Sequence, residues 1–115
     1  MTLRRLFYIN DDVSASELLV DTGASFSLLP HRSKAPARGP HLRAADNRRI
    51  WTWSTVERPL LIGGNTYKWC FIQADVGTAI LGIDFLRAHD LVVDVAGERL
   101  LPRLSIAAAN GVFVV

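Results

Sequence analysis

The sequence predicts an all-β barrel or sandwich, because short apolar runs alternate with turn signals along nearly its whole length. At 115 residues the chain is long enough to bury one core and too short for two lobes. Hydrophobic residues make up 50% of it, which suits a compact fold and argues against disorder. We therefore expect residues 1–115 to form a single domain.

Most of the expected strands pair as hairpins, with turn-forming residues between the two arms. Gly63-Gly64-Asn65 is the clearest such turn, between apolar runs at 60–62 and 67–72. One short helix is expected at 84–89, where Asp84 suits the positive end of the helix dipole. The other strands are expected at 6–9, 18–20, 26–29, 42–45, 50–54, 91–95, 99–101 and 112–115.

Cysteine and histidine usage gives no sign of a metal site or a disulfide framework. Cys70 is the single cysteine, and its apolar neighbours predict a buried position. The three histidines, His31, His41 and His89, are in no metal-ligand spacing. We expect neither a metal nor a cofactor.

The charge and hydropathy of the chain limit its partners. No apolar run approaches the length that spans a membrane, and the N-terminus lacks a signal-peptide core. We therefore expect a soluble, intracellular protein of the cytoplasm with no membrane partner. The formal charge of +2 is too small to imply nucleic acid, and we expect none as a partner.

Basic residues nevertheless cluster in one stretch of the chain. The simplest interpretation is a set of solvated loops. A role in binding acidic substrate or RNA would require a stripe of cations interleaved with stacking aromatics. The cluster consists of Arg32, Lys34, Arg38, Arg43, Arg48 and Arg49.

The main candidate for chemistry is the tripeptide Asp21-Thr22-Gly23. It follows the apolar run 18–20, so the carboxylate is expected where a buried strand gives way to a tight turn. Carboxylates in such settings are candidates for functional sites. Because Asp-x-Gly is also a common turn signal, the tripeptide needs a second signal. Ile80-Leu81-Gly82, far along the chain, provides it.

Three segments, in this order, resemble the retropepsins, the aspartic proteases of retroviruses and LTR retrotransposons. They are LLVDTGASFSLLP, LRAADNRRIWTWS and AILGIDFL, and the LTR-retrotransposon branch is the nearer match. The resemblance covers residues 5–101 and implies a small closed β-barrel, with one short helix, that assembles as a homodimer. The remaining tail, 102–115, is a possible strand of the dimer interface.

The resemblance implies that Asp21 is a catalytic residue. Two carboxylates that share one proton can hydrolyse a peptide bond without a metal, because like charges so close cannot both ionise. The chain carries only one Asp-Thr-Gly motif. A dyad therefore requires Asp21 from each of two copies, which makes the homodimer obligatory for activity.

The resemblance also gives roles to the neighbouring residues. Thr22, Gly23 and Ala24 support the active-site loop, and Ile80, Leu81 and Gly82 pass behind it. The hairpin tip formed by Ala45, Asp46, Asn47 and Arg48 matches the flap that closes over substrate, although family flaps are usually richer in glycine. Asp84 is either a helix-start acid or a contact to the active-site loop.

The expected function is that of a homodimeric aspartic endopeptidase. Its substrate would be an extended polypeptide, a Gag-Pol-type retroelement polyprotein, cleaved in the cytoplasm or within retroelement particles. The alternative keeps the fold without the activity, as a dimerisation or peptide-binding module.

Overall fold

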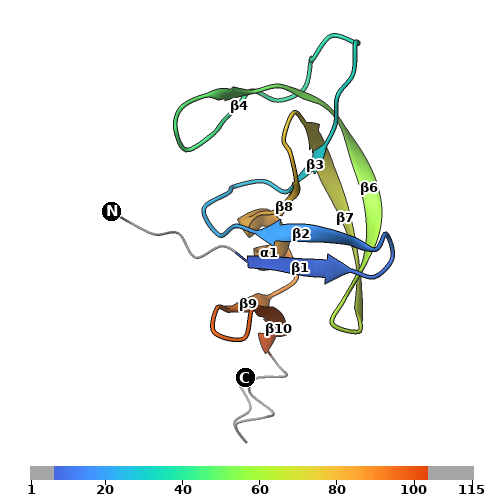
Figure 1. Ribbon diagram of the computed structural model, residues 1–115, viewed down its shortest axis with the longest axis vertical. Helices are drawn as coiled ribbons and strands as arrows, with labels where there is room; N and C mark the ends of the chain where they lie inside the picture. Colours follow the sequence, from blue (N-terminus) through green and yellow to red (C-terminus); the bar gives the residue numbers. More distant parts are fainter. Residues whose placement is uncertain (1–6, 104–115) are drawn as a thin grey trace, which may run out of the picture.

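The computed structural model describes residues 7–103, which form one six-stranded sheet and two small two-stranded sheets. The strand order in the large sheet is β1-β2-β8-β3-β7-β6, and the small sheets are β4-β5 and β9-β10 (Figure 1). The expected strand at 112–115, and the expected role of the tail at an interface, lie outside the described residues.

The elements follow the expected order closely. They are β1 (Phe7–Asp11), β2 (Ser16–Val20), β3 (Leu28–Pro30), β4 (Leu42–Arg43), β5 (Arg49–Ile50), β6 (Thr52–Ile62), β7 (Asn65–Ala74), β8 (Ala79–Leu81), α1 (Ile83–Ala88), β9 (Leu91–Asp94) and β10 (Arg99–Pro102). The β6-β7 hairpin turns at Gly63 and Gly64, whose φ angles of +56° and +81° are left-handed and favour glycine.

Several boundaries differ from the expected ones: β8 was not expected as a strand, β6 joins the expected strands 50–54 and 60–62 into one, and two further differences concern the pairing with β7. Strand β3 includes Pro30, which was expected to end it, because the next residue, His31, donates its N–H to the Ala74 carbonyl at 2.8 Å and continues the pairing with β7. The strand expected at 50–54 is divided at Trp51. The Trp51 carbonyl accepts a hydrogen bond from Asp75 N–H at 2.8 Å, and the register of β6 on β7 then shifts between Thr52 and Thr55.

Cys70 was expected to be buried, and this was wrong: its side chain is exposed. The reason is the alternation of side chains along β7. Phe71 is completely buried and Trp69 half-buried, so Cys70, between them, points to the outer face. The apolar character of its neighbours identified the strand correctly, but only the register decides which face a residue occupies.

The core packs the sheet against helix α1. Phe71, Leu81 and Phe85 are completely buried and lie in one cluster with residues of β1 and β2. Phe85 is surrounded by aromatic rings, with Tyr67 at 5.4 Å and Trp69 at 5.6 Å between ring centroids, both edge-on. These contacts fix α1, and with it the segment between β8 and the helix, against the sheet.

The large sheet does not close into a barrel within residues 7–103, contrary to expectation. Its edge strands, β1 and β6, approach each other at one end only, where Asp12 N–H donates to the Leu61 carbonyl at 2.9 Å. There the Asp11 carboxylate accepts the Leu61 N–H at 2.9 Å. In a continuous ladder between β1 and β6, a backbone carbonyl of β1 would accept this N–H instead. Because β1 ends at Asp11, the ladder cannot continue.

Asp11 is therefore a buried carboxylate that joins the two edges, with 3% of its surface exposed. It also accepts hydrogen bonds from Val13 N–H at 3.0 Å and from the Ser14 hydroxyl at 2.6 Å. Burial by itself raises the pKa of Asp11, but these hydrogen bonds outweigh it and hold the pKa below its ordinary value of 3.8.

We predict that Asp11→Ala lowers the free energy of unfolding by about 2–4 kcal/mol, because it leaves buried N–H groups without an acceptor. The lowered pKa means that the ionised carboxylate stabilises the fold above pH 3.8, and that this stabilisation disappears as the pH falls through the pKa of the folded state. The stability difference between wild type and Asp11→Asn should therefore shrink on acidification below about pH 4.

Urea unfolding at several pH values measures this difference. Asp12→Asn is the matched control, since its side chain is exposed and its loss should change little at any pH. A difference between wild type and Asp11→Asn that is independent of pH would contradict the proposed role of the carboxylate.

Candidate active site

Asp21 stands directly after β2, where that strand runs parallel to β8. Its N–H donates to the Leu81 carbonyl at 3.0 Å, which extends the β2-β8 ladder by one step. The chain then turns sharply: Gly23 N–H donates to Asp21 Oδ1 at 2.9 Å and Ala24 N–H to the Asp21 carbonyl at 3.1 Å. Asp21 is half-buried and Thr22 and Gly23 are exposed, so the turn presents a hydrogen-bonded carboxylate at the surface.

The segment after β8 crosses behind this turn at very short range. Ile83 N–H donates to the Ala24 carbonyl at 2.8 Å. A Cβ atom on Gly82 would lie 2.7 Å from the backbone of Phe26 and 2.8 Å from the Ala24 carbonyl oxygen. Only a residue without a side chain allows the two backbones to approach so closely.

A buried hydrogen-bond network locks the two segments together. Asp84 accepts the Ser27 hydroxyl at Oδ1 (2.7 Å) and the Ser27 N–H at Oδ2 (3.0 Å). It also accepts Phe85 N–H at 2.8 Å, and the Ser27 hydroxyl oxygen in turn accepts Gly82 N–H at 2.9 Å. Asp84 thus combines the two roles considered for it: it satisfies an N–H at the start of the helix and it contacts the active-site loop.

Ser27 is the residue of this site that the sequence did not single out. Only 1% of its surface is exposed, and its hydroxyl group is both donor and acceptor in the network. The one signal in the sequence is a small polar residue between Phe26 and Leu28, at a position where an apolar strand was expected. A buried hydroxyl there implies a polar partner, but the sequence could not say which one.

The four residues expected at the flap tip lie in the exposed turn between β4 and β5. Asp46 Oδ1 accepts Arg48 N–H at 3.0 Å, and Asn47 has a left-handed φ of +67°, which asparagine tolerates. Ala45 and Arg48 are exposed beside them. The structure thus brings the Asp21 turn and the Ile80-Leu81-Gly82 segment together, whereas the β4-β5 hairpin forms its own sheet and projects on the same side of the molecule (Figure 1).

Other classes of site are not seen in this part of the chain. Among residues 7–103, no three His, Cys, Asp or Glu side chains are grouped so that they could hold a metal ion. The described helix α1 is far too short to cross a membrane, and no longer apolar helix occurs in the same range.

Comparison with solved structures shows that the chain has the retropepsin fold. EIAV protease in complex with the inhibitor HBY-793 aligns with a TM-score of 0.55 and 23% identity, over 76% of this chain and 89% of the viral one. The retroviral protease-like domain of Ddi1 from Leishmania major aligns with a TM-score of 0.61 and 19% identity, over 85% and 88%. No protein-family model and no curated sequence matches. At these identities the likeness establishes the fold and no particular branch.

We predict that Gly82→Ala destabilises the protein by about 1–3 kcal/mol, because the added methyl group would press against backbone atoms that cannot move aside independently. Gly77→Ala is the matched control, since a Cβ there would meet no atom within 4 Å. Thermal unfolding of both variants checks the prediction. Equal midpoints for the two variants would show that the crossing is looser than described.

We predict that Asp84→Ala lowers the free energy of unfolding by about 1–3 kcal/mol, because the buried Ser27 and Phe85 donors lose their acceptor. Asp75→Ala removes an equally charged side chain whose ion pair within residues 7–103 is an exposed one, with Arg32 at 3.2 Å. That control should change stability by less than about 1 kcal/mol. Urea unfolding of the two variants compares them directly, and a larger loss in Asp75→Ala would refute the assignment.

Proposed function

We propose that the protein is a homodimeric aspartic endopeptidase in which Asp21 of each copy forms a catalytic dyad. The observation that carries this proposal is the Asp21-Thr22-Gly23 turn of a retropepsin fold, which follows β2, is crossed from behind by the segment after β8 and has its carboxylate at the surface. With one such motif in the chain, only a second copy can supply the second carboxylate.

The chemistry follows from two carboxylates that share one proton. The ionised carboxylate removes a proton from a water molecule, whose oxygen attacks the scissile carbonyl carbon, while the protonated carboxyl donates its proton to the carbonyl oxygen. As the tetrahedral intermediate collapses and the C–N bond breaks, one of its two hydroxyl groups returns a proton to the carboxylate that had donated one, and the departing amine takes up the proton that the other carboxyl had gained from water. In this proposal the hydroxyl of Thr22, an exposed residue, donates a hydrogen bond across the twofold axis and holds the two active-site loops together.

The surface beside the Asp21 turn supports assembly with a second copy. Phe26 and Ile83, which flank the crossing, expose 47% and 37% of their surfaces. A cavity of about 300 Å³ is lined by Thr22 and Ile83 together with other residues of α1 and β9 and of the turn between them. Exposed apolar groups around a polar turn are the expected composition of an interface that a monomer leaves uncovered.

The substrate in this proposal is an extended polypeptide bound as a β-strand over the Asp21 turn. Backbone hydrogen bonds would provide affinity and side-chain pockets would provide selectivity. The β4-β5 hairpin would act as the flap that closes over the substrate and excludes water. Processing of a retroelement polyprotein in the cytoplasm, and membership of the LTR-retrotransposon branch, belong to the same proposal.

We predict that wild-type protein cleaves a denatured protein mixture at mildly acidic pH, and that Asp21→Asn reduces cleavage by at least about a thousandfold, because the dyad then cannot hold an ionised carboxylate beside a shared proton. Mass spectrometry identifies the cleavage sites, and pepstatin should suppress them. Asp12→Asn, an exposed aspartate outside the site, should cleave as the wild type does.

Sedimentation of the same samples separates the two functions that the fold allows. A dimeric wild type that makes no cuts would favour the alternative, a dimerisation or peptide-binding module. That alternative is worth testing because the Ddi1 neighbour is described as a protease-like domain. A dimeric Asp21→Asn variant without activity, beside an active wild type, would support the enzyme.

A further inference from the structure

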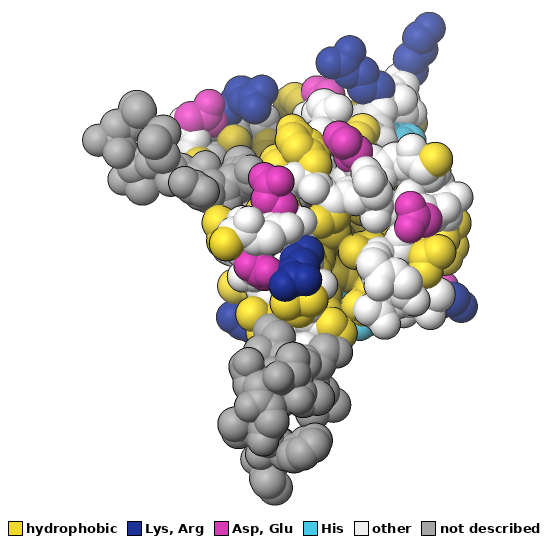
Figure 2. Space-filling model, turned by 60° about the horizontal axis from the view of Figure 1, so that its bottom comes forward, with side chains coloured by type: hydrophobic (Ala, Val, Ile, Leu, Met, Phe, Trp, Pro, Cys, Tyr) yellow, Lys and Arg dark blue, Asp and Glu magenta, His cyan; other side chains and the backbone are white. Residues whose placement is uncertain are grey.

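The charge of the chain is unevenly distributed, and this asymmetry is independent of the proposed active site. We call residues 31–51 the basic strip. It holds six of the thirteen Lys and Arg residues and, in Asp46, one of the eleven acidic residues. The remainder of the chain therefore carries more acidic than basic side chains. Figure 2 shows Lys and Arg side chains projecting from the upper rim, while further basic side chains and acidic side chains are spread over the rest of this face.

The positive charge of the basic strip is largely unneutralised. Its Lys and Arg side chains are all exposed. Arg32 forms an ion pair with Asp75, but Lys34, Arg38 and Arg48 form none within the described part of the chain. The carboxylate of Asp46 accepts a backbone N–H of its own turn. The strip is thus a cationic surface with little internal compensation, which attracts polyanions.

Aromatic side chains accompany these cations. Trp51 exposes 48% of its surface, and the guanidinium carbon of Arg49 lies 4.1 Å from the centroid of its ring. Arg49 Nη2 also lies 3.0 Å from His41 Nδ1, so the guanidinium is held in place over the indole. An arginine that stacks on a ring through the face of its guanidinium can still donate hydrogen bonds to an anion from the N–H groups at the edge of that plane.

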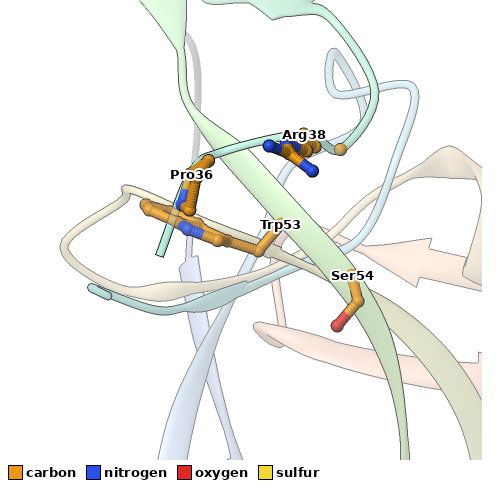
Figure 3. A pocket seen from close by; sticks show the side chains of 5 residues that line it. Pro36, Arg38, Trp53 and Ser54 are labelled. Atoms are coloured by element: carbon orange, nitrogen blue, oxygen red, sulfur yellow. The ribbon is translucent and has the colours of Figure 1, made fainter. Parts of the chain in front are cut away.

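A second tryptophan lies in an open cavity of about 440 Å³ in the same region. Figure 3 shows Pro36 against the Trp53 indole, with Arg38 close by and Ser54 further along the strand. Trp53 Nε1–H donates to the Ala35 carbonyl at 3.0 Å, and the His31 ring packs edge-on at 5.0 Å between centroids. The indole is therefore held in a fixed orientation beside a cation that has no ion-pair partner in the described residues.

We propose that the basic strip binds single-stranded nucleic acid. Proteins that bind single strands combine a positively charged track for the backbone with aromatic side chains on which bases stack. Here the cations extend over the loop 31–41 and the β4-β5 hairpin, which suits a repeating polyanion better than one acidic side chain. Trp51 and Trp53 provide the aromatic component that a partner of carboxylates alone would not need.

This proposal reverses the expectation from the sequence, and the reason is spatial. The net charge of +2 is a sum over the whole chain, in which the excess of acidic residues outside the basic strip offsets most of the positive charge of the strip. The two tryptophans come after the cations in the sequence, so no interleaved stripe is visible there. Folding places Trp53 beside Pro36 and Arg38, and Trp51 beneath Arg49, which supplies the missing arrangement.

The test is fluorescence anisotropy of a labelled single-stranded oligouridine with the full chain at low salt. We expect salt-dependent binding that the double variant Arg38→Glu/Arg48→Glu weakens by about tenfold or more, with a salt slope smaller by about 1.4 for two lost phosphate contacts. Arg58→Glu/Lys68→Glu is the matched control, because it changes the same charge at exposed positions of the β6-β7 hairpin. It should weaken binding far less.

A second variant separates nucleic acid from an acidic polypeptide. Trp51→Leu should reduce affinity for oligouridine by about fivefold to a hundredfold, the loss of one stacked base, and leave affinity for polyglutamate unchanged. Circular dichroism verifies that each variant is folded. Three outcomes would each overturn the proposal. The first is that the wild type does not bind oligouridine, and the second is that the two double variants lose the same affinity for it. The third outcome is tighter binding of polyglutamate than of oligouridine, together with no effect of Trp51→Leu on oligouridine binding.

Discussion

The close approach of two backbones at Gly82 is the constraint on which the rest of the site depends. The turn that carries Asp21 and the segment between β8 and α1 touch without side chains between them, and Ile83 N–H reaches the Ala24 carbonyl across the contact. Because β2 and β8 are neighbours in the sheet, this crossing fixes where the carboxylate emerges. Phe85, completely buried among aromatic rings, anchors helix α1 on the sheet and so keeps the segment before the helix in contact with the Asp21 turn.

Two carboxylates, Asp11 and Asp84, accept backbone N–H groups at places where no neighbouring strand supplies a carbonyl oxygen. Asp11 accepts the Leu61 N–H where β1 stops and the two sheet edges meet only briefly. Asp84 accepts the Ser27 N–H and hydroxyl where the chain leaves the Asp21 turn to enter β3. In both cases buried donors would otherwise lack a partner, which is more unfavourable than burying a well-bonded carboxylate. In these two irregular parts of the fold, carboxylate oxygens of side chains therefore take the place of backbone carbonyl acceptors.

The site and the basic strip divide the molecule into two kinds of surface. Around Asp21 the exposed groups are a polar turn and apolar side chains such as Phe26 and Ile83, a combination suited to contact with another polypeptide. The basic strip is cationic, and the Trp51 indole within it and the Trp53 indole beside it are both held by neighbouring side chains or backbone. Since the β4-β5 hairpin belongs to the strip and also projects on the side of the Asp21 turn, an anionic ligand and a polypeptide substrate would meet at the same hairpin (Figure 1).

Local signals in the sequence determined the all-β class, the hairpins, helix α1 and the Asp21 turn, because strands, glycine turns and an Asp-Thr-Gly motif depend on residues close together in the chain. The tertiary structure alone decided the features that join distant residues. These are the open sheet edge at Asp11, the bond from Ser27 to Asp84, the outward face of Cys70 and the placing of Trp53 beside Arg38. Register and long-range packing set each of them, and neither is encoded in any short stretch of sequence.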